Sequence, residues 1–205
     1  MPANATEWDA HHREKTKDSP AAPAGIVKEW LPMLRPGHTL DLACGTGRHT
    51  LFLAAQGHAV AAIDWSGAAL DILESRARRA KLQVSREAGI AVSGLSSRGM
   101  QLIQANLEET KLSEAFFELI LCFNYLQRSL FPLITRASRP GGMLLFETYT
   151  YAQQNYSDGP KNPAYLLRIG ELRTAFPGLR TLFYRELNAG QGIASLVAQK
   201  HHINA

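Results

Sequence analysis

The chain has few cysteines and no long apolar run. Its 205 residues include only two cysteines, and neither stands in a CxxC or CxxH pattern, which excludes a disulfide framework and a cysteine-based zinc site. No apolar stretch approaches the roughly 20 residues that cross a bilayer. The first residues also lack the basic segment and apolar core of a signal peptide. We therefore expect a cytoplasmic protein without membrane contact, in which Cys44 and Cys122 are reduced and buried.

An excess of charge of one sign is also missing. The formal net charge is only +4, and the basic residues are spread along the chain, so a nucleic-acid partner is not favoured. A hydrophobic content of 45% with 20% charged residues is typical of one large globular domain. We expect residues 1–36 to form an N-terminal arm and a covering helix, and residues 37–205 to form the main domain. The protein is expected to be a monomer or a homodimer.

The most informative stretch runs from residue 39 to residue 65. An apolar run enters a turn with Gly45 and Gly47, an amphipathic segment follows, and a second apolar run ends in Asp64. This order is typical of a βαβ nucleotide-binding unit. Glycines allow a ligand to approach the backbone closely, and a helix that starts after them presents free N–H groups. A carboxylate about 20 residues further on can accept the ribose hydroxyls.

Two kinds of nucleotide site compete for this pattern. A dinucleotide site would need a third Gly or an Ala where Thr50 stands. The run from Asp41 to Gly47 with the downstream acid instead resembles motif I of the class I S-adenosylmethionine (SAM)-dependent methyltransferases. The resemblance departs mildly at Ala43, where that family usually has another small residue. It implies SAM as the cofactor.

The resemblance extends over about residues 37–200. Further strands are expected at 101–105, 117–123, 143–149, 181–187 and 193–200, with R-P-G-G at 139–142 as the family's turn before a strand. Residues 83–99 are compatible with a loop or a short extra strand. The implied fold is α/β, a Rossmann-like seven-stranded, mostly parallel sheet with one antiparallel strand and helices on both faces. Within the family, the compact chain with G-x-G-R resembles the tellurite-resistance (TehB-like) small-molecule methyltransferases.

The resemblance also implies the cofactor residues. The glycine turn would hold the methionine end of SAM with Asp41, Asp64 the ribose, and Trp65 the adenine face. Asn106 would bind the adenine edge, although an Asn at this place can also simply cap the following turn. The full cofactor set is Asp41, Ala43, Gly45, Gly47, Arg48, Asp64, Trp65, Asn106, Leu107 and Phe123.

Residues just past the fourth expected strand would face the substrate. The candidates for catalysis are Tyr125, Arg128, Glu147 and His11. An oxygen or nitrogen nucleophile requires a base, which Glu147, Tyr125 or His11 could supply. A soft anion could instead be attracted by arginines, of which Arg48, Arg128 and Arg168 are candidates. No metal is expected.

Three segments outside these motifs leave alternatives open. Residues 4–18 form either a mobile arm or a lid, because Trp8 is costly to expose. The basic residues of the helix near 76–81 are expected on a solvated face. Residues 152–164 are expected to be a flexible insertion that could close over a substrate.

Three functions therefore compete. The first is a methyltransferase that acts on a small molecule, by direct displacement at the methyl group. The second is an RNA or protein methyltransferase, which would require the basic residues near 76–81 to face the cleft. The third is a SAM-binding protein without catalysis that acts as a sensor or partner subunit.

Overall fold

The computed structural model describes residues 4–15, 21–88, 91–92, 95 and 98–201. The chain divides into two compact units, residues 2–113 and residues 114–205. The expected arm and covering helix fall in the first unit. The boundary expected between residues 36 and 37 stays a prediction.

The first unit is built on a parallel sheet. Its strands are β1 (His38–Leu42), β2 (Ala59–Asp64), β3 (Val84–Ala88) and β5 (Gly99–Gln104), in the order β3-β5-β2-β1. Every residue of β2 is buried, as is typical of parallel strands that are covered on both faces. Strand β3 lies within residues 83–99, for which the sequence is compatible with a loop or a short extra strand. It is an edge strand that adds one strand to those expected. A separate parallel pair joins β4 (Ala91–Val92) and β6 (Lys111–Leu112).

Two helices of this unit cover the sheet strands. Helices α3 (Arg48–Ala55) and α4 (Gly67–Arg79) both contact β2 and β5, and they also contact each other. Helix α4 begins where the Ser66 hydroxyl accepts the Ala69 N–H at 3.1 Å, which is the cap that the sequence predicts. Helix α2 (Gly25–Trp30) continues into the 3-10 turn η1 (Leu31–Met33).

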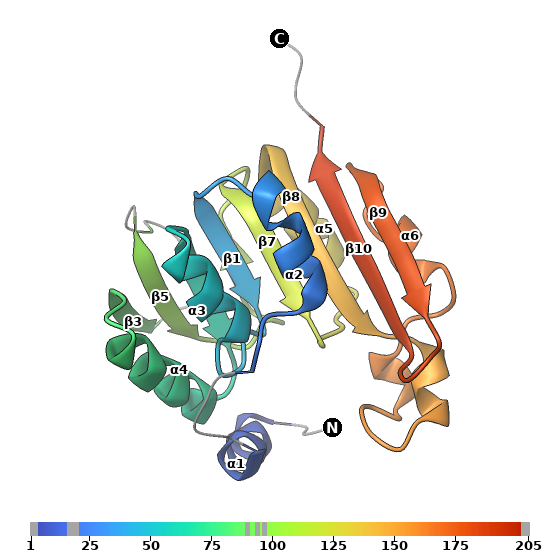
Figure 1. Cartoon of the computed structure of the whole chain (residues 1–205), viewed down its shortest axis with the longest axis horizontal. Helices are drawn as coiled ribbons and strands as arrows, with labels where there is room; N and C mark the ends of the chain where they lie inside the picture. Colours follow the sequence, from blue (N-terminus) through green and yellow to red (C-terminus); the bar gives the residue numbers. More distant parts are fainter. Residues whose placement is uncertain (1–3, 16–20, 89–90, 93–94, 96–97, 202–205) are drawn as a thin grey trace. The chain divides into compact units, whose positions relative to one another are not determined.

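The N-terminal helix α1 (Ala5–Lys15) lies beside α4 (Figure 1). It starts with a cap, since the Asn4 side-chain oxygen accepts the Glu7 N–H at 3.0 Å and Glu7 accepts the Asn4 amide at 3.1 Å. Trp8 is half-buried. The structure therefore forms the arm as a helix that contacts α4.

The second unit carries the antiparallel part of the fold. Strand β7 (Phe117–Phe123) pairs in parallel with β8 (Ser138–Tyr149), and β10 (Ile193–Lys200) is antiparallel to both β8 and β9 (Leu179–Leu187). Helix α5 (Leu130–Ala137) contacts β8. The expected α/β architecture, mostly parallel with an antiparallel C-terminal hairpin, is confirmed.

The segment expected as a flexible insertion is held by one buried side chain. Gln153, in the 3-10 turn η2 (Tyr151–Asn155), donates to the Asp158 carbonyl at 2.8 Å and accepts the Gly192 N–H at 2.9 Å. The short helix that the sequence predicts over 164–176, with a break at Gly170, is present as η3 (Pro163–Tyr165) and α6 (Glu171–Thr174). Gly170 separates the two because its backbone is left-handed, with φ of 75°.

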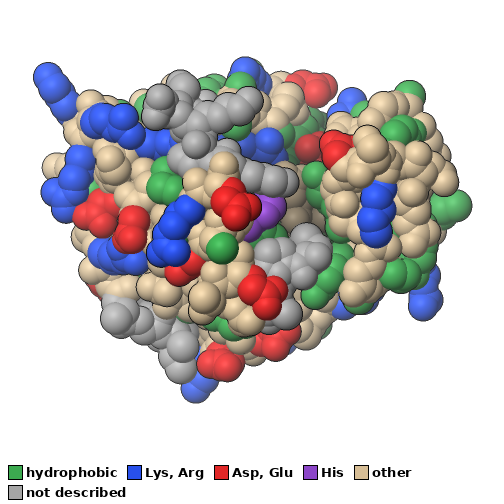
Figure 2. All heavy atoms as spheres, turned by 90° about the horizontal axis from the view of Figure 1, so that it is seen from below, with side chains coloured by type: hydrophobic (Ala, Val, Ile, Leu, Met, Phe, Trp, Pro, Cys, Tyr) green, Lys and Arg blue, Asp and Glu red, His purple; other side chains and the backbone are tan. Residues whose placement is uncertain are grey.

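Within the described ranges, every helix is too short or too polar to span a bilayer. Cys44 and Cys122 are both buried, and neither is in a disulfide. On the face that Figure 2 draws, Lys and Arg side chains lie among Asp and Glu side chains. This face therefore does not present a continuous basic surface of the kind that binds nucleic acid.

Candidate active site

The loop after β1 is a tight turn with three left-handed residues. Ala43, Gly45 and Gly47 have φ values of 52°, 54° and 80°, and the Gly47 N–H donates to the Cys44 carbonyl at 3.0 Å. A Cβ atom on Gly47 would lie 2.1 Å from Leu73 Cδ1 on α4. Glycine at position 47 is thus required both by its backbone conformation and by the close approach of α4.

Asp64 joins this turn to the end of β2. Its carboxylate accepts the Gly45 N–H at 2.7 Å and the Ser66 N–H at 2.9 Å, and the residue is 8% exposed. Burial raises the pKa of Asp64, while the hydrogen bonds from Ser66 and Gly45 oppose the rise. The structure thus brings together the glycine and the acid that the sequence spacing pairs.

Asp41 on β1 is buried near the same turn. Its carboxylate accepts the Thr50 hydroxyl at 2.6 Å. Burial raises the pKa of Asp41 to about 6; Thr50 and Arg48 act in the opposite direction, and the charge of Asp64 adds to the rise. Arg48, at the start of α3, is half-buried. The chain therefore keeps a second carboxylate beside the turn, next to the place expected for the ammonium group of SAM.

Replacing Asp41 with Asn is expected to stabilise the protein at pH 7.5 by about 1–3 kcal/mol. The pKa of Asp41 is about 6 in the folded chain against 3.8 for an unperturbed Asp, so the ionised form disfavours folding above pH 6. This cost disappears as the pH falls toward 4, because both states then bind the proton. Urea unfolding of both proteins at pH 7.5 and pH 5 measures the effect. Equal stabilities at pH 7.5 would contradict it.

Arg76 corrects one expectation. The sequence places it on the solvated face of α4, but the structure buries it, and its guanidinium donates to the Thr46 carbonyl at 3.1 Å. Burial, together with the charge of Arg79, lowers the pKa of Arg76. The neighbouring Arg78 does face outward and pairs with Glu74 at 2.6 Å. Arg76 follows Leu73 by three residues, so it lies at the edge of the apolar stripe of α4, and the helical period could have indicated this.

We predict that Arg76→Met weakens SAM binding about tenfold, because the glycine turn loses the side chain that holds its Thr46 carbonyl. Arg78→Met is the matched control, since it removes an exposed arginine from the same helix and should change the Kd less than about twofold. Calorimetric titration with SAM measures both. The same Kd for the two variants would show that Arg76 does not support the turn.

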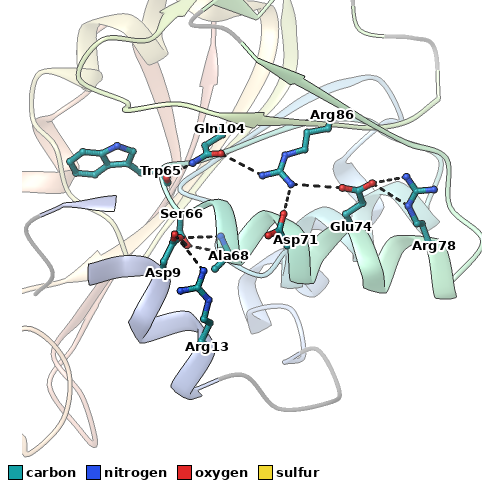
Figure 3. Close-up of polar contacts among 11 residues, drawn as sticks. Asp9, Arg13, Trp65, Ser66, Ala68, Asp71, Glu74, Arg78, Arg86 and Gln104 are labelled. Carbon is teal, nitrogen blue, oxygen red and sulfur yellow. Dashed lines mark hydrogen bonds and ion pairs between the residues drawn. The ribbon is translucent and has the colours of Figure 1, made fainter. Parts of the chain in front are cut away.

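The side chains expected at the adenosine end lie at the tips of β2 and β5. Trp65 is 37% exposed, and Gln104 donates to its carbonyl at 3.4 Å (Figure 3). Leu107 is buried. The Asn106 side-chain oxygen accepts the Glu108 N–H at 3.1 Å, so the turn-capping alternative is present, and its adenine role stays a prediction. A glycine turn, a hydrogen-bonded carboxylate and an exposed indole are the groups that fit an adenosyl ligand.

The arm brings a different histidine to this turn from the one expected. The His12 Cε1 atom lies 3.5 Å from the position of a Cβ on Gly45, and burial lowers the pKa of His12 while Asp64 and Asp9 raise it. The ring of His11 instead contacts Trp8 edge-on, with 5.4 Å between the centroids. His12 and Asp9 were missed because no sequence pattern relates α1 to residues more than 30 positions away.

The cofactor candidate Phe123 and the catalytic candidates Tyr125 and Glu147 lie in the second unit. Phe123 ends β7 and is buried, and Asn124 follows it in a left-handed conformation with φ of 57°. The Tyr125 hydroxyl donates to Gln127 at 2.5 Å. Glu147 on β8 accepts the Ser195 hydroxyl at 2.7 Å. Tyr125 and Glu147 are both partly exposed, as a proton acceptor for a substrate must be.

Arg128 has a structural role that the sequence did not indicate. Its guanidinium makes two hydrogen bonds to Glu171, at 2.5 and 2.9 Å, and donates to the carbonyls of Ala164 and Leu166 at 3.2 and 3.0 Å. Glu171 raises the pKa of Arg128 through these bonds. The side chain thus ties the segment around η3 to α6 through four of its five N–H donors, and its role in attracting an anion stays a prediction.

Comparisons with known proteins agree with this geometry. No curated protein matches the chain. Among solved structures, TehB from Haemophilus influenzae has a TM-score of 0.69 at 16% identity, covering 94% of this chain and 66% of its own. A SAM-dependent methyltransferase from Methanosarcina mazei has a TM-score of 0.61 at 17% identity, covering 89% and 100%.

A third similar structure is that of a protein described for the conversion of a disulfide bond into a thioacetal group during echinomycin biosynthesis. Its TM-score is 0.68 at 17% identity, and the alignment covers 98% of this chain and 94% of that protein. At these identities the structures show the fold alone. The methyltransferase domain family model matches residues 40–146, which include the glycine turn, Asp64 and Tyr125. The chain therefore belongs to the methyltransferase domain family and is a class I SAM-dependent methyltransferase.

Proposed function

We propose that the methyl acceptor is a small molecule: a thiol, an oxyanion, or a hydroxyl or amine. The observation that carries this proposal is the orientation of the arginines of α4. Arg76 is turned inward to Thr46, and Arg78 is paired with Glu74. Two of the four basic residues near 76–81, which an RNA methyltransferase would need to direct at its substrate, are therefore engaged within the protein.

The cofactor supplies an electrophilic methyl group on a sulfonium when it is bound. The contribution of the chain is then to orient the reactants and to exclude water, which can account for several kcal/mol of the barrier without an acid or a base. We assign the ribose to Asp64, the methionine end to the turn at Gly45 and Gly47, and the adenine face to Trp65. Asp41 and Arg48, which lie beside the turn, supply a carboxylate and a guanidinium near the amino-acid end of SAM.

The need for a base depends on the acceptor. A hydroxyl or amine must lose a proton, and Glu147 and Tyr125 are the candidates to receive it. A thiolate or an oxyanion needs no base but favours a cation nearby. Arg48, Arg128 and Arg168 are the arginine candidates for that role, and Arg128 is also bound to Glu171. The similarity to the protein described for the conversion of a disulfide bond into a thioacetal group favours sulfur nucleophiles as the first acceptors to test.

One combined experiment separates the three functions. Calorimetry with SAM, S-adenosylhomocysteine and NAD is followed by a screen of S-adenosylhomocysteine release over thiols, oxyanions, phenols and bulk RNA. Turnover with a small acceptor supports the proposal, and turnover with RNA alone supports the second function. Tight binding of SAM without any turnover over the whole screen contradicts the proposal and is the result expected of a non-catalytic sensor or of a protein methyltransferase, and binding of NAD alone would overturn the cofactor assignment. The cytoplasmic location and the oligomeric state stay predictions.

A further inference from the structure

One carboxylate of the N-terminal helix, that of Asp9, is bonded to the start of α4. Asp9 Oδ1 accepts the Ser66 hydroxyl at 2.5 Å and the Ala68 N–H at 3.0 Å, and Arg13 lies 3.9 Å from Asp9 Oδ2 (Figure 3). The first bond lowers the pKa of Asp9. Asp9 thus caps the start of α4 from a different helix, and it satisfies an N–H group that α4 itself leaves without an acceptor.

The residues that hold Asp9 also hold the candidate ribose acid. Ser66 donates its backbone N–H to Asp64 at 2.9 Å and its hydroxyl to Asp9 at 2.5 Å. The two carboxylates are therefore bound to the same residue, through different atoms. Ser66 is therefore the single residue that links Asp9 on α1 to Asp64 at the turn, through its hydroxyl on one side and its backbone N–H on the other.

Three residues after Asp9, the same helix places an imidazole at the glycine turn. Residues three apart lie on one face of a helix, so the docking of Asp9 also determines where His12 lies. The His12 Cε1 atom lies 3.5 Å from the Cβ position of Gly45. The His12 ring also stacks with Trp8, at 5.8 Å between centroids and 27° between planes. His12 therefore contacts both the turn and an aromatic ring of its own helix.

We infer that His12 is a residue of the cofactor site, contributed by α1, and that Asp9 is the positioning residue that holds it there. The inference rests on the proposed assignment of SAM to the turn at Gly45 and to Asp64. In this position the imidazole shields the amino-acid end of the cofactor from water and adds contact area to the bound ligand. Ligand binding and docking of α1 then stabilise each other, because each is more favourable when the other is present.

Binding of S-adenosylhomocysteine, which cannot turn over, tests both roles by calorimetry. His12→Ala and Asp9→Ala are each expected to raise the Kd about tenfold. The double variant is expected to bind about as weakly as either single variant, because Asp9 acts through His12. Asp9→Asn keeps an acceptor oxygen for Ser66 and Ala68 and should recover most of the affinity. Glu14→Ala is the matched control: it removes an exposed carboxylate from the same helix and should change the Kd less than twofold.

A second measurement needs no ligand. Limited digestion with trypsin, followed by mass spectrometry of cleavage after Arg13, reports whether α1 is docked. Cleavage is expected to be several times faster in Asp9→Ala than in the wild type or in Asp9→Asn. S-adenosylhomocysteine is expected to slow the cleavage of the wild type, since the ligand favours the docked helix.

The outcomes distinguish the inference from the function on which it rests. If the wild type binds and the Asp9 and His12 variants bind as well as Glu14→Ala, the inference is wrong and the SAM site stands. If the effects of Asp9→Ala and His12→Ala simply add, Asp9 does not act through His12, and its positioning role is wrong. If the wild type binds neither S-adenosylhomocysteine nor SAM, the proposed site itself fails, and the role of His12 with it.

Discussion

Asp64→Asn is expected to weaken SAM binding by about a hundredfold, which corresponds to about 2.7 kcal/mol. The carboxylate accepts two backbone N–H groups, from Gly45 and Ser66. An Asn side chain has only one acceptor oxygen, so its amide nitrogen must face one of these N–H groups and repel it. The turn is then displaced, and the ribose hydroxyls lose a charged acceptor. The loss of the hydrogen bond between the ribose and the charged carboxylate is of the size known for hydrogen bonds to charged groups, about 1.5–3 kcal/mol.

Calorimetric titration with SAM measures this effect, and Asp71→Asn is its control. Asp71 is an exposed carboxylate of the same unit that pairs with Arg86 on β3 (Figure 3), so its loss removes the same charge away from the turn. We expect Asp71→Asn to bind SAM like the wild type. A similar Kd for Asp64→Asn and the wild type would remove the ribose assignment.

Gly47→Ala should destabilise the folded protein by about 2–4 kcal/mol and abolish measurable SAM binding. The new methyl group would lie 2.1 Å from Leu73 Cδ1, and the residue must keep a φ of 80°. Neither the turn nor α4 can move freely, because Arg76 joins them through the Thr46 carbonyl. Urea unfolding and calorimetry measure the two effects.

Two further variants separate the causes. Gly190→Ala has a similar φ of 78° with no atom within 4 Å of the new Cβ, so it isolates the backbone strain, of order 1 kcal/mol. Leu73→Ala in the Gly47→Ala background removes the clash and should restore part of the binding. If Gly47→Ala were no more destabilising than Gly190→Ala, the contact with Leu73 would not determine the choice of glycine.

The local patterns of this sequence were sufficient for most of the fold. Strands β7 and β10 have the bounds that the apolar runs predict, and Ser66 caps α4 as expected. The pairing of Gly45 with Asp64 was also predictable, because the carboxyl ends of adjacent parallel strands meet at one edge of a sheet. Strand β3 was harder to assign, since glycines and serines interrupt its surroundings.

The features that the sequence did not reveal are contacts between distant segments. The sequence indicates neither the contact of Arg76 with the Thr46 carbonyl nor the contact of Arg128 with Glu171. No sequence pattern indicates that Gln153 is buried and accepts the Gly192 N–H. Polar side chains that bind backbone carbonyls far along the chain leave no periodicity, so only the three-dimensional structure identifies them.

The left-handed backbone of Ala43 and Asn124 has a consequence for how this protein can change. Both residues carry a Cβ atom that resists this conformation, and each follows a strand directly. This conformation disfavours the native state by about 1 kcal/mol at Ala43 and by less at Asn124, because a short polar side chain tolerates it; a glycine would relieve the cost. Substitution of glycine at these two loop positions could therefore raise the thermal stability of the protein without any change in its apolar core.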